Sequence, residues 1–162
     1  VNYAVGRFGE DTKILLYGVS MGAATVLMAG GLDLPRNVVG IVADCGYSSP
    51  AAIIRKVIRD QHLPIFPVYQ LIRLGGKLFG VFDLESATVT DALAHCDIPV
   101  LLIHGGDDRF VPCDMGRENY AHCAAHNKHL LVVPGAGHGL SCMVDREAYL
   151  AALESFLRSV LD

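Results

Sequence analysis

The chain has 162 residues, of which 52% are apolar and 19% are charged, so it is long and apolar enough to bury a core as one compact domain. Its formal net charge is −4 and its Lys and Arg residues form no dense run, which argues against nucleic acid or an anionic membrane surface as a partner. The longest apolar stretches, such as 99–103, are far shorter than the roughly 20 residues of a membrane-spanning helix, so we expect no membrane span.

The five cysteines and the first residues bear on the cellular setting. An odd number of cysteines cannot close into a full set of intramolecular disulfides, and no Cys-x-x-Cys pair occurs in the sequence. The sequence opens without an initiator Met and without a basic and apolar leader pattern, so we expect it to start inside a longer protein. We therefore expect reduced thiols and a cytoplasmic location.

Short apolar runs rich in Val, Ile and Leu alternate with helical segments along the chain. The opening residues are typical of the end of a helix that is stopped by Gly9 and packed on a sheet. The expected strands are 13–18, 38–45, 99–104 and 129–133. The expected helices are 21–29, 51–59, 68–79, 114–125 and 146–161. Continuous apolar strands alternating with helices predict an α/β fold, with a mostly parallel sheet of about four strands and helices on both faces.

Residues from about 48 to 94 interrupt this alternation. Two prolines within 63–67 are expected to end one helix and to restart the next. We interpret this segment as a helical cap inserted into a partial α/β domain that spans residues 1–162.

The segment Gly18-Val19-Ser20-Met21-Gly22 matches the pattern G-x-S-x-G and lies between an expected strand and an expected helix. Such a turn holds its serine in a strained backbone geometry, and a side chain at either flanking glycine is expected to collide with its neighbours. The strain would expose Ser20 Oγ and direct the Met21 N–H toward the place where an oxyanion forms. Ser20 is thus a candidate nucleophile; the alternative is a Gly-rich turn with an idle serine.

A serine hydroxyl needs a base, and the base needs an acceptor that fixes its tautomer. Asp107 and Asp108 follow the expected strand 99–104, and His138 lies in a Gly-rich loop after the expected strand 129–133. Either aspartate could orient the histidine, while the other caps the turn through its side chain. His138 could alternatively be a solvated loop histidine.

With these three loops the sequence resembles the α/β-hydrolase superfamily, and within it the bacterial serine esterases and lipase-like proteins. The resemblance is carried by GVSMGA at 18–23, HGGDDRFVP at 104–112 and PGAGH at 134–138. It implies Ser20 as the nucleophile, Asp108 as the orienting acid, His138 as the general base and the Met21 N–H as an oxyanion donor. It also implies that a second oxyanion donor and the first strands of the sheet precede Val1.

Together these features predict a serine hydrolase of carboxylic esters that forms an acyl-enzyme and uses no cofactor. Apolar cap residues are expected to line an acyl pocket for a small hydrophobic ester: Ile65, Phe66, Val68, Tyr69 and Leu71. An amidase, peptidase or thioesterase could use the same triad. From another class, the chain could be a non-catalytic hydrolase fragment that acts as an interaction module. A bare edge on the first expected strand predicts a homo-oligomer or a companion N-terminal fragment.

A second set of candidate ligands lies at the end of the expected helix 114–125 and directly after it. His122 and His126 are one helical turn apart and flank Cys123, so they could bind Zn²⁺ if a third ligand converged on them. No HExxH glutamate accompanies them, and we expect no metal. Cys142 is interpreted as a small packed hydrophobe without a role. The other histidines are expected to be structural or surface groups: His62, His95, His104 and His129.

Overall fold

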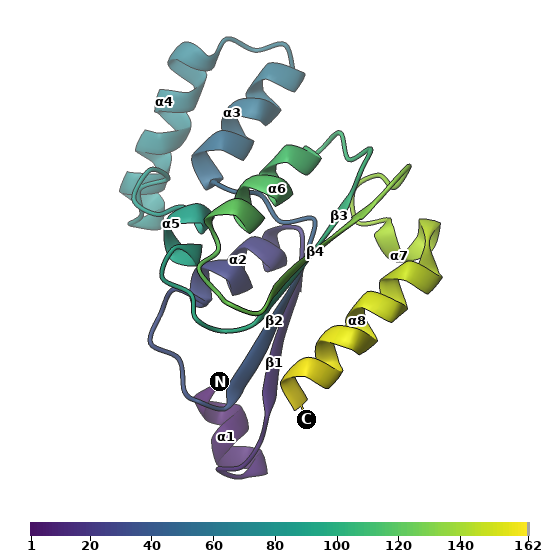
Figure 1. Cartoon of the computed structure of the whole chain (residues 1–162). Coiled ribbons are helices and arrows are strands. Elements are labelled where there is room, and N and C mark those ends of the chain that lie inside the picture. The colour runs from purple at the N-terminus through teal and green to yellow at the C-terminus, as the bar shows by residue number, and fades with distance from the viewer. Residues whose placement is uncertain (162) are drawn as a thin grey trace.

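The computed structural model describes residues 1–161 and contains one parallel sheet (Figure 1). Its strands lie side by side in chain order: β1 (Ile14–Val19), β2 (Val38–Asp44), β3 (Val100–Gly105) and β4 (Lys128–Val133). All four were expected from their continuous apolar runs, which are typical of strands covered on both faces. The predicted parallel sheet is confirmed.

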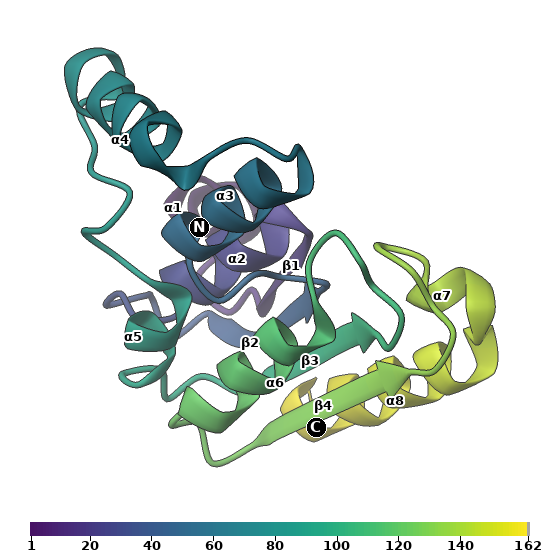
Figure 2. The same cartoon turned by 90° about the horizontal axis from the view of Figure 1, so that it is seen from above.

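Helices cover the sheet on both faces, as Figure 2 shows from above. One face carries α2 (Met21–Ala29), α5 (Val89–Leu93) and α6 (Cys113–His122), and the other carries α7 (Ser141–Val144) and α8 (Arg146–Leu161). Successive strand residues divide between two cores: Ile41 and Ala43 pack toward α2, while Val42 packs toward Phe156 of α8. This alternation follows from the two-residue period of a strand.

The first helix, α1 (Asn2–Phe8), departs from the expectation. It ends before Gly9, whose φ is 106°, as the sequence predicted, yet none of its residues is buried. Tyr3 and Phe8 are exposed, and the helix projects beyond the start of β1 (Figure 1). The predicted packing of this helix on the sheet is therefore wrong for the described residues, because its apolar side chains find no partner there.

The cap segment contains three further helical elements, α3 (Pro50–Asp60), α4 (Ile65–Gly75) and the π-helix η1 (Gly76–Gly80). Helix α3 begins at Ser49, whose hydroxyl accepts the Ala52 N–H, with a proline at its first position. Helices α3 and α4 pack on each other through Ile58 and Tyr69 and project away from the sheet (Figure 1).

The expected cap of 48–94 is not a single unit. Val89 and Leu93 of α5 are fully buried in the main core with Leu27 of α2. The projecting part therefore comprises α3, α4 and η1, and α5 belongs to the body that positions the site. No helix within the described 161 residues has the length and apolar character needed to cross a bilayer.

Candidate active site

Ser20 occupies the turn between β1 and α2, at φ 56° and ψ −116°, a strained geometry for a residue with a side chain. Gly18 explains how the turn closes, since a Cβ there would lie 2.2 Å from the Gly22 carbonyl oxygen. The same does not hold for Gly22, where a Cβ would meet nothing within 4 Å. The expected collision at both glycines is thus correct for Gly18 and wrong for Gly22, whose missing side chain would point away from the strand.

The structure brings the three predicted side chains together from three different loops. Ser20 Oγ donates to His138 Nε2 at 2.9 Å, and His138 Nδ1 donates to Asp108 Oδ2 at 2.7 Å. Each loop follows the carboxyl end of a strand, namely β1, β3 and β4, and parallel strands present those ends at one edge of the sheet. This linear chain of hydrogen bonds is the arrangement that activates a hydroxyl as a nucleophile.

Asp108, rather than Asp107, faces the histidine. The Asp108 side chain is fully buried, and its Oδ1 accepts the backbone N–H groups of Phe110 and Val111, each at 2.9 Å. These bonds leave Oδ2 for His138. Asp107 is exposed, so of the two candidate acids only Asp108 is placed against the histidine.

The histidine and the acid loop receive further support from their neighbours. The Phe110 ring lies edge-on to the His138 ring, with centroids 5.0 Å apart. Lys56 of α3 reaches the same loop, where it bonds the Arg109 carbonyl and lies 5.9 Å from the Phe110 ring centroid. The projecting helices are therefore tied to the loop that carries the acid.

A buried histidine supports the acid loop from beneath. His104 Nε2 donates to the Val111 carbonyl at 2.9 Å and lies 3.6 Å from Asp108 Oδ2. Its side chain is 1% exposed, which agrees with the structural role expected for it.

Two residues at the end of β2 were missed by the sequence analysis. Asp44 is buried, accepts the Tyr149 hydroxyl at 3.2 Å, and leaves its Oδ1 without a hydrogen-bond partner in the described chain. Burial raises the pKa of the Asp44 carboxyl, and it raises the pKa of the adjacent Cys45 thiol to about 11. The sequence carried one signal for Asp44 and Cys45, namely their position at the carboxyl end of a buried strand. The carboxyl ends of the parallel strands meet at the edge of the sheet where Ser20 lies.

Met21 is the first residue of α2, so its N–H belongs to the helix's first turn, where backbone donors lack intrahelical partners. The positive end of the helix macrodipole also lies at this end of α2. The Met21 N–H thus follows Ser20 directly at the start of α2, and its role as an oxyanion donor stays a prediction.

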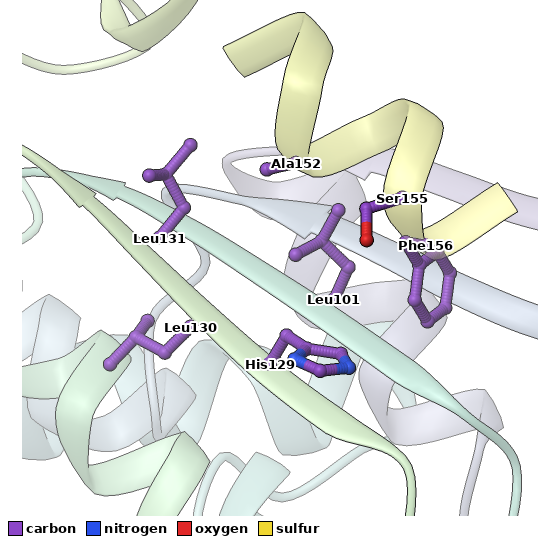
Figure 3. Close-up of a pocket in the computed structure, with 7 residues that line it drawn as sticks. All are labelled: Leu101, His129, Leu130, Leu131, Ala152, Ser155 and Phe156. Atoms are coloured by element: carbon purple, nitrogen blue, oxygen red, sulfur yellow. The ribbon is translucent and has the colours of Figure 1, made fainter. Parts of the chain in front are cut away.

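The expected acyl pocket is not formed by the cap residues. Tyr69 is buried in the cap's own core, whereas Phe66 and Leu71 are exposed to solvent. A cavity of about 210 Å³ lies between β4 and α8 (Figure 3), and a groove of about 600 Å³ lies between α2 and α5. Neither hollow is lined by Ser20 or His138, so neither lies at the candidate triad.

The other possible ligand set does not converge. His122 Nδ1 bonds the Glu118 carbonyl of its own helix at 2.9 Å, Cys123 is buried in the core, and His126 is exposed. Within the part of the chain that the structure describes, three donors of different residues gather elsewhere, beside Ser20. All five cysteines carry free thiols.

Comparisons with known proteins agree with this architecture. A family model described as serine aminopeptidase, S33, matches residues 82–142, which include Asp108 and His138. An uncharacterised protein of Mycobacterium tuberculosis is 29% identical over 148 residues, or 91% of this chain and 46% of its own length. A non-heme haloperoxidase of Rhodococcus erythropolis is 36% identical over 80 residues, or 49% of this chain and 28% of its own length.

An esterase of Pyrococcus furiosus superposes with a TM-score of 0.71 at 20% identity, over 99% of this chain and 59% of its own. The chain thus spans about half the length of the curated relatives that it matches along most of its sequence. These likenesses confirm the α/β-hydrolase fold and the resemblance to esterase-like members of that superfamily.

Proposed function

We propose that this esterase-like α/β-hydrolase is a serine hydrolase of carboxylic esters, with Ser20 as its nucleophile. The observation that carries the proposal is the continuous hydrogen-bonded chain from Ser20 Oγ through His138 to Asp108. An idle serine in a Gly-rich turn has no reason to face a histidine that is itself held by a buried carboxylate. We propose ester hydrolysis as the activity of the whole protein as well.

In the proposed reaction, Ser20 Oγ attacks the ester carbonyl carbon while His138 Nε2 takes the hydroxyl proton. Asp108 holds the imidazole in the tautomer that leaves Nε2 free to accept, and it stabilises the imidazolium that forms. The Met21 N–H stabilises the oxyanion. The imidazolium then protonates the leaving alcohol, and water attacks the acyl-enzyme with His138 as the base.

The surroundings of Ser20 favour an apolar acyl group. Met21, Phe110 and Leu140 lie next to the triad in the chain, and all three are exposed. They offer apolar contact to a substrate that reaches Ser20 from solvent. A small hydrophobic ester is therefore the substrate class we propose, now on the basis of these residues instead of the cap.

A fluorophosphonate probe tests the nucleophile directly. Ser20 should be labelled in the folded protein, Ser20→Ala should not be labelled, and Ser155→Ala, which removes an exposed hydroxyl on α8, should label like the wild type. Turnover of p-nitrophenyl esters should exceed that of matched anilides and acyl thioesters. Faster cleavage of anilides or thioesters would instead favour the amidase, peptidase or thioesterase alternative, and an unlabelled folded protein would refute an activated serine.

The edge of the sheet favours a second candidate function, that of an interaction module. Strand β1 has one neighbour, β2, in the described chain, and Tyr17 and Val19 on it are about half exposed. Unpaired edges with apolar side chains pair with other chains. We propose that this edge joins a second copy or an N-terminal companion segment; a monodisperse monomer in light scattering at micromolar concentration would contradict the self-association.

A further inference from the structure

Cys45 lies between the nucleophile turn and the histidine loop. It follows β2 directly at φ 50°, its N–H donates to the Ile103 carbonyl at 2.9 Å, and it is fully buried. Its sulfur lies within 4.8 Å of a ligand atom of Asp108 and of His138, which belong to two different loops. The thiol thus lies beside the candidate triad, although the proposed hydrolysis makes no use of it.

The thiol belongs to a cluster of three potential ligands. Donor atoms of Cys45, Asp108 and His138 all lie within 4.8 Å of one another, and the two hydrogen-bonded members are 2.7 Å apart. Ligand atoms on one tetrahedral Zn²⁺ are roughly 3.3–3.8 Å apart, given bonds of about 2.0–2.3 Å. A three-ligand site would therefore form if the carboxylate and imidazole donors separated by roughly 0.6 Å and the thiol approached them by up to about 1 Å.

The donor set selects the kind of ion. One sulfur, one carboxylate oxygen and one imidazole nitrogen suit Zn²⁺, whereas Mg²⁺ and Ca²⁺ prefer oxygen ligands alone. One feature outside the cluster favours a cation. The Phe110 and Val111 N–H groups hold the carboxylate through its other oxygen, as outer partners of a metal ligand do.

We propose that Cys45, Asp108 and His138 form a Zn²⁺ site that switches the triad off. Binding transfers the thiol proton to solvent, forms the zinc–sulfur bond, and leaves a fourth coordination position for water. If the imidazole binds through Nε2, it can no longer accept the Ser20 proton. If it binds through Nδ1, the Nδ1 proton moves to Nε2, so the hydrogen bond to Asp108 is lost and Nε2 can no longer act as a base. The inhibition rests on the proposed function, whereas the binding of zinc does not.

Binding is tested first, without any activity measurement. Equilibrium dialysis should find one Zn²⁺ per chain, and Co²⁺ in its place should give a thiolate-to-cobalt charge-transfer band. Cys45→Ser should weaken Zn²⁺ binding by at least about 100-fold and abolish the band, since loss of a ligand exceeds the roughly 10–100-fold effect of outer partners. Cys142→Ala is the matched control, because it removes a partly buried thiol outside the cluster. Ser20→Ala should bind Zn²⁺ like the wild type.

Inhibition is tested second, as the ratio of fluorophosphonate labelling rates with and without Zn²⁺ in each protein. This ratio should fall at least about tenfold in the wild type and in Cys142→Ala, should be restored by EDTA, and should stay near one in Cys45→Ser. Circular dichroism and urea unfolding establish that each variant is folded; if Cys45→Ser is not, the cobalt band and stoichiometry of the wild type decide. Absence of 1:1 binding, or binding retained by folded Cys45→Ser, would overturn the site. Zinc binding with unchanged labelling would overturn the switch.

Discussion

Replacing Asp108 by Asn is the sharpest test of the site, because the structure separates the two oxygens of this carboxylate by task. Oδ1 accepts two backbone N–H groups at 2.9 Å, and Oδ2 accepts His138 Nδ1–H at 2.7 Å. In Asp108→Asn the amide oxygen keeps the two backbone bonds, so the amide NH₂ must face the imidazole. His138 Nδ1 then has to accept, which moves the imidazole proton to Nε2, opposite the Ser20 hydroxyl.

A proton on Nε2 removes the base from the reaction while the fold is retained. Loss of the correct tautomer in a serine triad lowers the catalytic rate by roughly 10⁴-fold, which corresponds to about 5 kcal/mol of transition-state stabilisation. Stability should change far less, because every backbone donor on the loop keeps an acceptor of the same size. We expect the free energy of unfolding to change by no more than about 1 kcal/mol.

The assay is the rate constant for fluorophosphonate labelling, with ester turnover beside it and urea unfolding as the measure of folding. Asp107→Asn is the control, because it makes the same chemical change at an exposed neighbour. It should label at the wild-type rate. Asp108→Asn that keeps more than a tenth of the wild-type rate, or an equal loss in both variants, would refute the assignment of the acid.

Three further outcomes follow from the packing and the buried carboxyl. Gly18→Ala should lower the free energy of unfolding by about 1–3 kcal/mol and slow labelling, since the added Cβ meets the Gly22 carbonyl oxygen. Gly22→Ala should raise the free energy of unfolding by about 0.5–1 kcal/mol, because the added Cβ meets nothing there. Urea titrations measure both changes. Phe156→Ala should lower the unfolding free energy by about 3–5 kcal/mol, because this ring is buried between α8 and the sheet; thermal and urea unfolding measure it. Burial raises the pKa of Asp44 in the folded state, so the unfolded chain loses this proton at a lower pH than the folded chain does. The contribution of protonated Asp44 to the free energy of unfolding is therefore complete below the unfolded-state pKa and is lost as pH rises through the folded-state pKa. The stability of the wild type relative to Asp44→Asn should therefore fall as pH rises above about 4, the ordinary pKa of an aspartate, and a difference independent of pH would contradict the shift.

The sheet and the candidate triad could be predicted from the sequence because both depend on local patterns. Four continuous apolar runs mark the strands within one or two residues of their observed ends. Ser20, Asp108 and His138 each lie in a short loop directly after such a run, and parallel strands bring these loops to one edge. Knowledge of where each strand ends was therefore enough to place three distant side chains together.

The errors arise where position depends on packing between elements that no local pattern encodes. Helix α5 follows the cap in sequence but packs in the main core, because Val89 and Leu93 complete the apolar surface against α2. The acyl pocket expected from Phe66 and Leu71 failed for a related reason. An amphipathic helix has one apolar face to bury, and α4 uses its buried side against α3, which leaves Leu71 in solvent. Phe66 is also exposed, but it lies at a non-helical kink near the start of α4, with φ −94° and ψ 131°.

The edge rule that places the triad also explains why Cys45 is part of the site. Its strand β2 lies between β1 and β3, so the first residue after β2 must emerge between the nucleophile turn and the acid loop. A small side chain fits there, and a thiol is a small side chain that can also bind zinc. Zinc binding by Cys45→Ala and Cys45→Ser shows which of these two properties matters. If the thiol is a ligand, both variants lose zinc binding. If the thiol serves packing alone, both variants bind zinc as the wild type does.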